Sequence, residues 1–272
     1  FFKQTTAYEI PLRLVGSEMC IRDSSYGCHE NYLVDRLTPF GEIITHATTH
    51  FITRQIFTGS GKIGVEATGV DSNSIKYQIT QRADFFEEEV GLETTLKRPI
   101  INTRDEPHAD ATKYRRLHVI CGDANMSETA TFLKVGSTSI LLAMVEDNFL
   151  TKRIVFDNPV RCIKEVSHDP SLKQRLSLND GSTITALEVQ WEILNSASSY
   201  VPKGGGEFAG GVVADEIINT WEHVLTGLEN NPESLRSEID WIAKRLLIES
   251  FADRHNLSIF DPNIQNREQT DG

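Results

Sequence analysis

The sequence predicts an α+β fold, in which extended segments come first along the chain and helices follow them. Residues 114–122 (YRRLHVICG) alternate between apolar and polar side chains in the way that a strand does. Residues 215–228, and the segment that starts at Asn231-Pro232, instead carry apolar residues at helical spacing. Strands that precede helices, rather than alternating with them, are typical of α+β domains.

The first predicted elements are an extended segment and a helix. In residues 25–33 (SYGCHENYL), alternation puts His29 and Asn31 on one side and Glu30 on the other. From spacing alone, His29 and Asn31 are equally well explained as ordinary loop hydrogen bonders. A helix then opens at Thr38-Pro39, with threonine as N-cap and proline at the first helical position. Its apolar stripe consists of Phe40, Ile43, Ile44, Ala47 and Phe51.

Two histidines on this helix, His46 and His50, invite comparison with the H-E-x-x-H zinc motif. Ala47 stands where that motif requires glutamate. We therefore expect both histidines to have a solvated or capping role.

The middle of the chain contains a predicted strand pair and a loop rich in charged residues, which is the best candidate for a functional site. Residues 62–66 and 75–81 predict a strand pair around a turn at 71–73. Residues 102–110 (NTRDEPHAD) then gather charged side chains between apolar runs, which indicates a site loop or a plain surface loop.

The strand that follows has two different faces. Leu117, Val119 and Cys121 share one face, which suits a core, whereas Arg116 and His118 share the other with Ile120. Arginine offers a fork of donors for phosphate or carboxylate, and neutral histidine is a common metal ligand, so the pair suits a metal-bound polyphosphate. The alternative is that both side chains merely pair with neighbouring carboxylates.

The second half of the chain is interpreted as scaffold. Asn125 or Ser127 is expected to cap a long helix to about Asp147, with Phe132, Val135, Ile140 and Met144 on its buried side. Later predictions are short strands at 154–156 and 162–166, a hairpin turn at 179–181, a helix at 186–200 and a glycine-rich loop at 202–211.

Composition narrows the classes of partner. The chain has 272 residues, of which 39% are hydrophobic, and no apolar run is long enough to cross a bilayer. A formal net charge of -12 argues against nucleic acid as a partner. Residues 97–116 are nevertheless locally basic, which fits a small anionic ligand or an acidic peptide. The four cysteines form no C-x-x-C pair and indicate reduced thiols in a cytoplasmic protein.

Two segments carry a resemblance to a known family. Residues 82–128 (RADFFEEEVGLETTLKRPIINTRDEPHADATKYRRLHVICGDANMSE) and 25–33 (SYGCHENYL) resemble the Pup ligase/depupylase family, and the likeness continues more weakly to about Pro262. Within that family, FFEEEVGLETTLK resembles the depupylase branch. Cys28 and Met126-Ser127 look more like the ligase branch.

The resemblance implies a fold and an activity. The fold is a glutamine-synthetase-like carboxylate-amine ligase fold, whose curved, mostly antiparallel sheet is packed with helices and cradles ATP and Mg²⁺. The implied activity is a depupylase and Pup deamidase that needs ATP without consuming it stoichiometrically. It hydrolyses the isopeptide bond between the side chain of the C-terminal glutamate of Pup and a substrate lysine, and it deamidates the C-terminal glutamine of Pup. Its partners are Pup and pupylated proteins of the bacterial proteasome pathway. A Pup ligase, or a catalytically inactive fragment that binds nucleotide or Pup, remains an alternative.

The resemblance also implies roles for residues. His29 and His118 match positions that hold magnesium, although histidine is an unusual ligand for that ion. Asn31 and Arg116 match nucleotide contacts. We assign Arg104 as a catalytic clamp for a phosphate or carboxylate, because a fixed bidentate donor stabilises developing negative charge.

The resemblance finally implies a division of the chain. Residues 1–24 include LVGSEMCIRDS, which resembles translated adapter DNA, and are expected to be a non-native leader. Residues 25–262 are expected to be a partial catalytic domain, and 263–272 a frayed or foreign tail. The catalytic aspartate and the glutamate-rich metal motif are expected in an N-terminal part that this chain lacks, so the chain alone should be inactive.

Overall fold

The computed structural model describes residues 27–66, 70, 74–92, 97–105, 109–207 and 211–255. Its main sheet contains β1 (Gly27–Asp35), β6 (Tyr114–Asp123), β5 (Arg98–Asn102) and β4 (Phe86–Gly91), in that spatial order. β6 pairs antiparallel with both β1 and β5, whereas β4 and β5 are parallel. The predicted strand at 25–33 and the predicted strand at 114–122 are therefore hydrogen-bonded neighbours.

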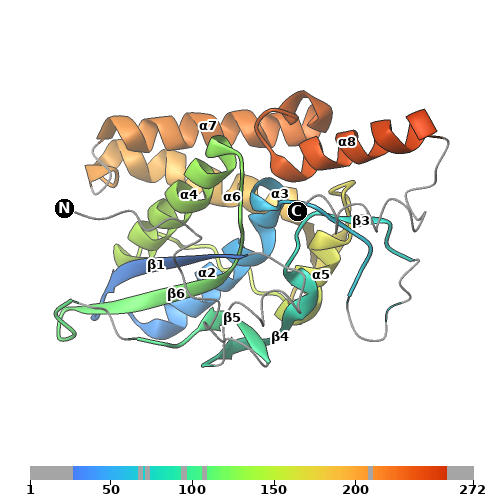
Figure 1. The fold of residues 1–272 in the computed structure, drawn as a ribbon. Helices are drawn as coiled ribbons and strands as arrows, with labels where there is room; N and C mark the ends of the chain where they lie inside the picture. The colour runs from blue at the N-terminus through green and yellow to red at the C-terminus, as the bar shows by residue number, and fades with distance from the viewer. Residues whose placement is uncertain are drawn as a thin grey trace, which may run out of the picture.

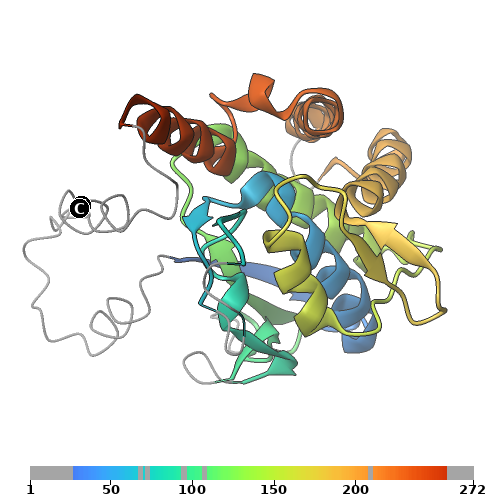
Figure 2. The same ribbon diagram turned by 90° about the vertical axis from the view of Figure 1, so that its right-hand side faces the viewer.

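Helices cover one side of this sheet (Figure 1). α2 (Phe40–Thr53) contacts β5, and α4 (Glu128–Glu146) contacts β1. A second layer, formed by α6 (Ala186–Tyr200) and α7 (Gly211–Asn230), packs on α4. Seen from a second direction, β4 and β5 of this sheet lie at the lower edge of the molecule and α7 lies at its upper edge (Figure 2). This arrangement of sheet and helices confirms the predicted α+β class.

Shorter elements complete the described chain. They are α3 (Gln55–Thr58), α5 (Pro159–Ser167), α8 (Asp240–His255), the 3-10 helices η2 (Ala83–Phe85), η3 (Val201–Lys203) and η5 (Pro232–Leu235), and two small antiparallel pairs, β2 (Lys62–Ile63) with β3 (Tyr77–Gln78) and β7 (Arg175–Ser177) with β8 (Thr183–Thr185). Gly181 adopts a φ of 85° in the turn between β7 and β8, which glycine allows without steric cost. The hairpin at 179–181 is thus confirmed.

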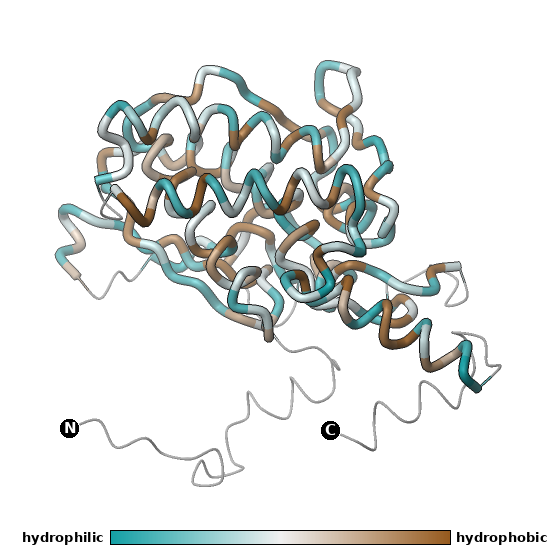
Figure 3. Tube along the Cα trace, turned by 90° about the horizontal axis from the view of Figure 1, so that it is seen from above, coloured by the Kyte–Doolittle hydropathy of each residue, from teal (hydrophilic) through white to brown (hydrophobic). Residues whose placement is uncertain are grey.

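The core lies between the sheet and the helices. Leu117 and Val119 of β6 are buried, as are Ile43 and Phe51 of α2 and Trp221 of α7. Along the outer helices, hydrophobic and hydrophilic residues alternate within each turn (Figure 3), which is the pattern of a helix that packs on one side only. Within the described residues, no helix is both long and apolar enough to cross a membrane.

The predicted role of His46 and His50 was wrong. His50 is fully buried, with its ring edge against Trp221 and its Nε2 3.2 Å from Thr138 Oγ1, and His46 is 9% exposed. α2 is in contact with α4, α5 and α6 as well as with the sheet, so it has no wide solvated face. The prediction was wrong because it assumed that one side of the helix would face solvent.

Other predicted elements also differ from the structure. Residues 162–166 lie in α5 rather than in a strand, because Asn158 caps the helix and Pro159 starts it. Pro39, without a side-chain cap, replaces Thr38 at the N-cap of α2. Val135 is 45% exposed rather than buried. The segment after Asn231 is divided between η5 and α8 instead of forming one helix.

Candidate functional site

The open face of the sheet brings together side chains from three strands. The register pairs Asn31 of β1 with His118 of β6, and His118 with Asn102 of β5. Leu33 of β1 pairs with Arg116 of β6, and each lies two residues from the Asn31–His118 pair. Since alternate residues of a strand share a face, Asn31, His118 and Arg116 lie on the same side.

His29 joins this group from β1. Its ring centroid lies 5.2 Å from that of His118, in an edge-to-face arrangement. The pairing of β1 and β6 shifts between Cys28 and Glu30, which is a bulge or irregularity next to His29. Such irregularities re-aim side chains and are frequent beside functional sites. Four of the five residues predicted from the sequence, His29, Asn31, Arg116 and His118, are therefore brought together on one face.

β1 presents these residues because its other face is anchored. The exposed residues of β1 alternate with Glu30 and Val34, which are buried. Arg54, which lies between α2 and α3, holds the Glu30 carboxylate with two bonds, from Nη1 to Oε2 at 2.9 Å and from Nη2 to Oε1 at 2.5 Å. Tyr32 also donates its hydroxyl proton to Glu30 Oε2. A buried bidentate ion pair thus fixes the strand directly between His29 and Asn31.

Two arginines that the sequence interpretation did not single out also lie near His29. Burial, followed by the positive charges of Arg82 and Arg98, lowers the pKa of His29 and favours its neutral form. Arg82 donates from Nε to the Ile120 carbonyl at 3.1 Å, and the guanidinium of Arg98 lies 5.4 Å from the ring centre of Phe85. Three guanidinium groups therefore lie near the two histidines: those of Arg82 and Arg98, which are buried, and that of Arg116.

A signal for Arg98 was available in the sequence. Arg98, Ile100 and Asn102 are alternate residues of β5, and Asn102 faces His118. Alternation applied to residues 98–102 would have placed Arg98 on the face of Asn102. Arg82 gave no such signal, because it lies in an irregular segment before η2.

Arg104 lies apart from the other four predicted residues. It is exposed in the loop that follows β5, and its backbone N–H donates to Asn102 Oδ1 at 3.0 Å. Among the described residues, no hydrogen bond or ion pair links its guanidinium to His29, Asn31, Arg116 or His118. Residues 106–108 of the same loop lie outside the described residues.

The donors on this face suit anions better than a magnesium ion. Guanidinium groups bind phosphate and carboxylate through paired N–H donors. Magnesium instead requires oxygen ligands in octahedral geometry. Across the described part of the chain, no group of three or more His, Cys, Asp or Glu residues is placed to hold a metal ion. The two imidazoles alone do not make a magnesium site.

Two of the described cysteines, Cys121 and Cys162, are poor nucleophiles. Burial raises the pKa of Cys121 to about 11 and that of Cys162 to about 12. Both thiols are therefore protonated at neutral pH, and a protonated thiol is a poor nucleophile.

Comparisons with known proteins show which proteins this chain is similar to. The depupylase of Acidothermus cellulolyticus is 50% identical over 236 residues, which cover 87% of this chain and 46% of that protein. The Pup deamidase/depupylase of Mycolicibacterium smegmatis is 44% identical over 253 residues, covering 93% and 49% of the two chains. The chain thus spans about half the length of these relatives.

Two solved structures of a Pup ligase have a similar fold. The Pup ligase PafA in complex with ADP superposes with a TM-score of 0.78 and 40% identity, over 88% of this chain and 52% of that one. The complex of PafA with the prokaryotic ubiquitin-like protein Pup gives a TM-score of 0.76, over 88% and 48%. The family model described as Pup-ligase protein matches residues 4–270. By this match over nearly its whole length, the chain belongs to the Pup-ligase protein family.

Proposed function

We propose that the open face of the sheet binds the phosphates of an adenine nucleotide. The observation that carries this proposal is the convergence of Arg82, Arg98 and Arg116 beside two histidines on one face. Each guanidinium offers a planar set of donors that matches phosphate oxygens. A relative with 40% identity and the same fold was solved with ADP, which supports ATP as the nucleotide.

We propose the following individual roles. Arg116 and Asn31 contact the nucleotide from neighbouring strands. His29 and His118 would hold a phosphate-bound magnesium ion, and oxygen atoms would have to supply its other ligands. The metal would neutralise phosphate charge, and the imidazoles would orient the nucleotide by hydrogen bonding. Arg104, on its exposed loop, is proposed as a clamp for an incoming carboxylate or phosphate.

We further propose that the protein hydrolyses amide bonds at the C-terminus of Pup. Relatives named depupylase or Pup deamidase/depupylase are 43% to 50% identical to this chain. On this proposal, the nucleotide is needed but not consumed stoichiometrically. The substrates are pupylated proteins, cleaved at the isopeptide bond to lysine, and Pup with a C-terminal glutamine. The free cysteines of the described residues support a reducing, cytoplasmic setting.

A Pup ligase is the second candidate. It is favoured by the solved structures, both of which are of PafA. Ligation and hydrolysis use the same nucleotide face and differ in the acceptor, which is a lysine amine in one and water in the other. A protein that only binds nucleotide or Pup is the third candidate.

The first experiment tests nucleotide binding by the chain itself. Titration calorimetry with ADP should give saturable binding to the native chain and binding at least about tenfold weaker to Arg116→Ala. Arg161→Ala removes an arginine from an exposed ion pair on α5 and should leave affinity unchanged. Equal affinities in all three proteins would refute the proposed nucleotide face.

The second experiment tests the reaction. Because the chain spans about half of its relatives, it is joined to the remainder of the Acidothermus cellulolyticus depupylase and incubated with ATP, magnesium and a Pup–lysine conjugate. Free Pup detected by mass supports the hydrolase. New conjugates formed from Pup ending in glutamate, with little cleavage, support the ligase. Intact ADP binding with neither reaction supports the binding protein.

A further inference from the structure

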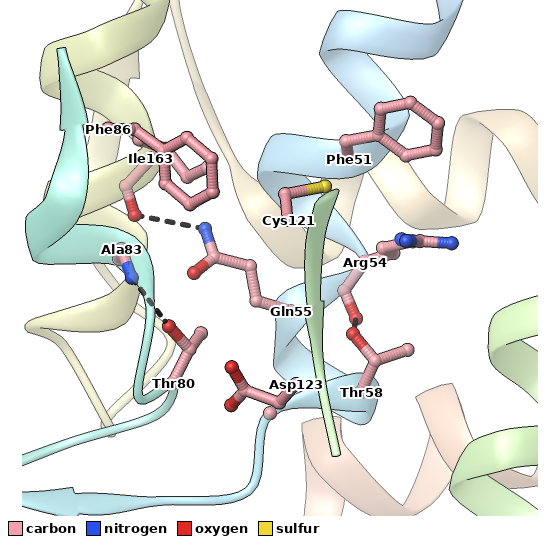
Figure 4. A pocket seen from close by; sticks show the side chains of 11 residues that line it. Phe51, Arg54, Gln55, Thr58, Thr80, Ala83, Phe86, Cys121, Asp123 and Ile163 are labelled. Carbon is pink, nitrogen blue, oxygen red and sulfur yellow. Dashed lines mark hydrogen bonds between the residues drawn. The ribbon is translucent and has the colours of Figure 1, made fainter. Parts of the chain in front are cut away.

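A small internal cavity lies on the helix side of the sheet, away from the proposed nucleotide face. Its volume is about 10 Å³, which is about the space that one water molecule requires. Gln55 of α3, Asp123 at the end of β6 and Thr80 lie around it (Figure 4). All three residues are almost completely buried, with exposed fractions of 5%, 2% and 5% respectively.

Asp123 has one satisfied and one unsatisfied carboxylate oxygen. Oδ2 accepts three hydrogen bonds, from the Ser60 N–H at 2.8 Å, from Ser60 Oγ at 3.1 Å and from the Gln81 N–H at 3.0 Å. Oδ1 is buried and accepts no hydrogen bond from any described residue. A buried carboxylate oxygen without a donor is costly, so native proteins nearly always supply one.

Gln55 presents a second acceptor to the same cavity. Its Nε2 donates to the Ile52 carbonyl at 2.6 Å and to the Ile163 carbonyl at 2.9 Å, and these two bonds fix the orientation of the amide. Oε1 is consequently held away from both carbonyls, and no donor from the described residues reaches it. The cavity is therefore bordered by two acceptors that have no partner.

Thr80 supplies a donor. Its Oγ1 accepts from the Arg82 N–H at 3.1 Å and from the Ala83 N–H at 3.0 Å. These bonds use the lone pairs of the oxygen and leave its own proton to be donated.

We propose that one ordered water molecule occupies this cavity, donating to Gln55 Oε1 and Asp123 Oδ1 and accepting from the Thr80 hydroxyl. The arrangement matches the two donors of water to the two unpartnered acceptors. It gives the water three hydrogen bonds, the usual number for a buried water. A metal cation fits less well, because it needs more oxygen ligands than these three side chains offer. The positive charges of Arg54 and Arg82 nearby also oppose a cation.

The water has a structural consequence for the segment that carries Arg82. Asp123 already holds Gln81 through its backbone N–H, and the water adds a link to Thr80. Residues 80 and 81 are thereby fastened to β6 and to α3 immediately before Arg82, whose Nε reaches the Ile120 carbonyl. The buried link therefore holds the backbone next to Arg82, whose charge acts on His29.

A crystal structure of the native chain, grown in sodium and again in thallium salts, tests the occupant directly. The expected result is a density peak within hydrogen-bonding distance of Gln55 Oε1, Asp123 Oδ1 and Thr80 Oγ1, without anomalous signal in thallium. An anomalous peak would show a monovalent cation and overturn the proposal. A dry cavity would overturn it too. Burial raises the pKa of Asp123, so a protonated Asp123 that donates directly to Gln55 is the form that a dry cavity would indicate.

A matched pair of variants tests the fastening role. Gln55→Met removes one acceptor at nearly constant volume and should abolish the water peak. It should also speed hydrogen exchange of the Gln81 amide by about three- to tenfold, the effect of losing one net hydrogen bond. Gln190→Met is the control, because Gln190 is also buried, also has an unpartnered Oε1 and lies outside the cavity. Equal exchange at Gln81 in the two variants would overturn the fastening role, even where the peak is seen in the native chain.

Discussion

At the residue scale, the chemistry of the open face depends on how charge is held beside His29. Burial and the charges of Arg82 and Arg98 lower the pKa of His29, so its imidazole is neutral while the arginines stay charged. A neutral imidazole does not repel the cation that accompanies a bound phosphate group. It can still donate one hydrogen bond and accept one. Arg116 is therefore the residue whose removal reports most directly on phosphate binding.

Arg116→Ala should weaken ADP binding more than adenosine binding. A hydrogen bond to a charged group contributes about 1.5–3 kcal/mol, which is about 10- to 150-fold in affinity. Calorimetry with both ligands checks the result. A parallel loss for ADP and adenosine would show that the variant disturbs the nucleoside pocket or the fold, rather than a phosphate contact.

His50 should make the stability of the protein sensitive to mild acid. Burial first, and then the charge of Arg54, hold the pKa of His50 well below 6.5 in the folded chain. The unfolded chain takes up the proton more readily, so the stability contributed by neutral His50 is present above about pH 6.5 and is lost as pH falls below that value. Urea unfolding at about pH 7.5 and about pH 5.5 should show a smaller pH effect in His50→Gln than in the native chain.

The exposed histidine on α7 provides the control for that experiment. His223→Gln removes a histidine whose side chain is 60% exposed and pairs with Glu238 at the surface. This variant should keep the pH dependence of the native chain. If both variants behave alike, the acid sensitivity does not arise from His50.

At the scale of elements, the nucleotide face depends on how β1 is attached to the helices behind it. Glu30 lies between His29 and Asn31 and points to the covered side, where Arg54, at the C-terminal end of α2, holds it. Arg54 also donates to Thr138 Oγ1 and to the Lys134 carbonyl of α4. One guanidinium therefore joins β1, α2 and α4, the three elements directly behind the site.

Glu30→Gln should destabilise the chain strongly and loosen the site. Removing one partner of a buried ion pair typically costs about 3–5 kcal/mol, because the remaining charge stays buried without its counter-charge. The control is Glu192→Gln, which breaks the exposed pair with Lys152 and should cost less than about 1 kcal/mol. Urea unfolding measures both. A similar small cost for the two variants would mean that Arg54 finds another partner and that the pair does not anchor β1.

At the scale of the whole molecule, a strongly acidic protein carries one basic face. The formal net charge is -12, yet Arg82, Arg98 and Arg116 lie near His29 and His118. These arginines attract a small anion at short range. At longer range, salt screens both their charges and the negative charges of the surrounding surface.

ADP binding should accordingly depend on salt, whereas adenosine binding should not. Raising NaCl from about 0.1 M to about 1 M shortens the screening length from about 10 Å to about 3 Å. We expect ADP affinity to fall severalfold over that range, since phosphate recognition rests on charge. Adenosine carries no phosphate and serves as the matched ligand. Equal salt dependence for both would contradict a phosphate site on the basic face.

The sequence by itself determined the strands and the candidates within them. Alternation in residues 114–122 predicted the shared side of Arg116 and His118, and alternation in 25–33 predicted that of His29 and Asn31, because the side-chain period of a strand is a local property. The α+β class and the helix at 186–200 followed from local patterns in the same way. The family resemblance on residues 82–128 linked the two strands to one site.

Only the tertiary structure decided which of these residues meet. The antiparallel register places Asn31 opposite His118 and brings the ring of His29 to within 5.2 Å, and register between distant strands is not encoded in either strand alone. The same holds for Arg82 and for the buried His50, whose surroundings come from segments far away in the sequence. Packing fixed their charge states, because burial and neighbouring charges exist only once the helices and the sheet have come together.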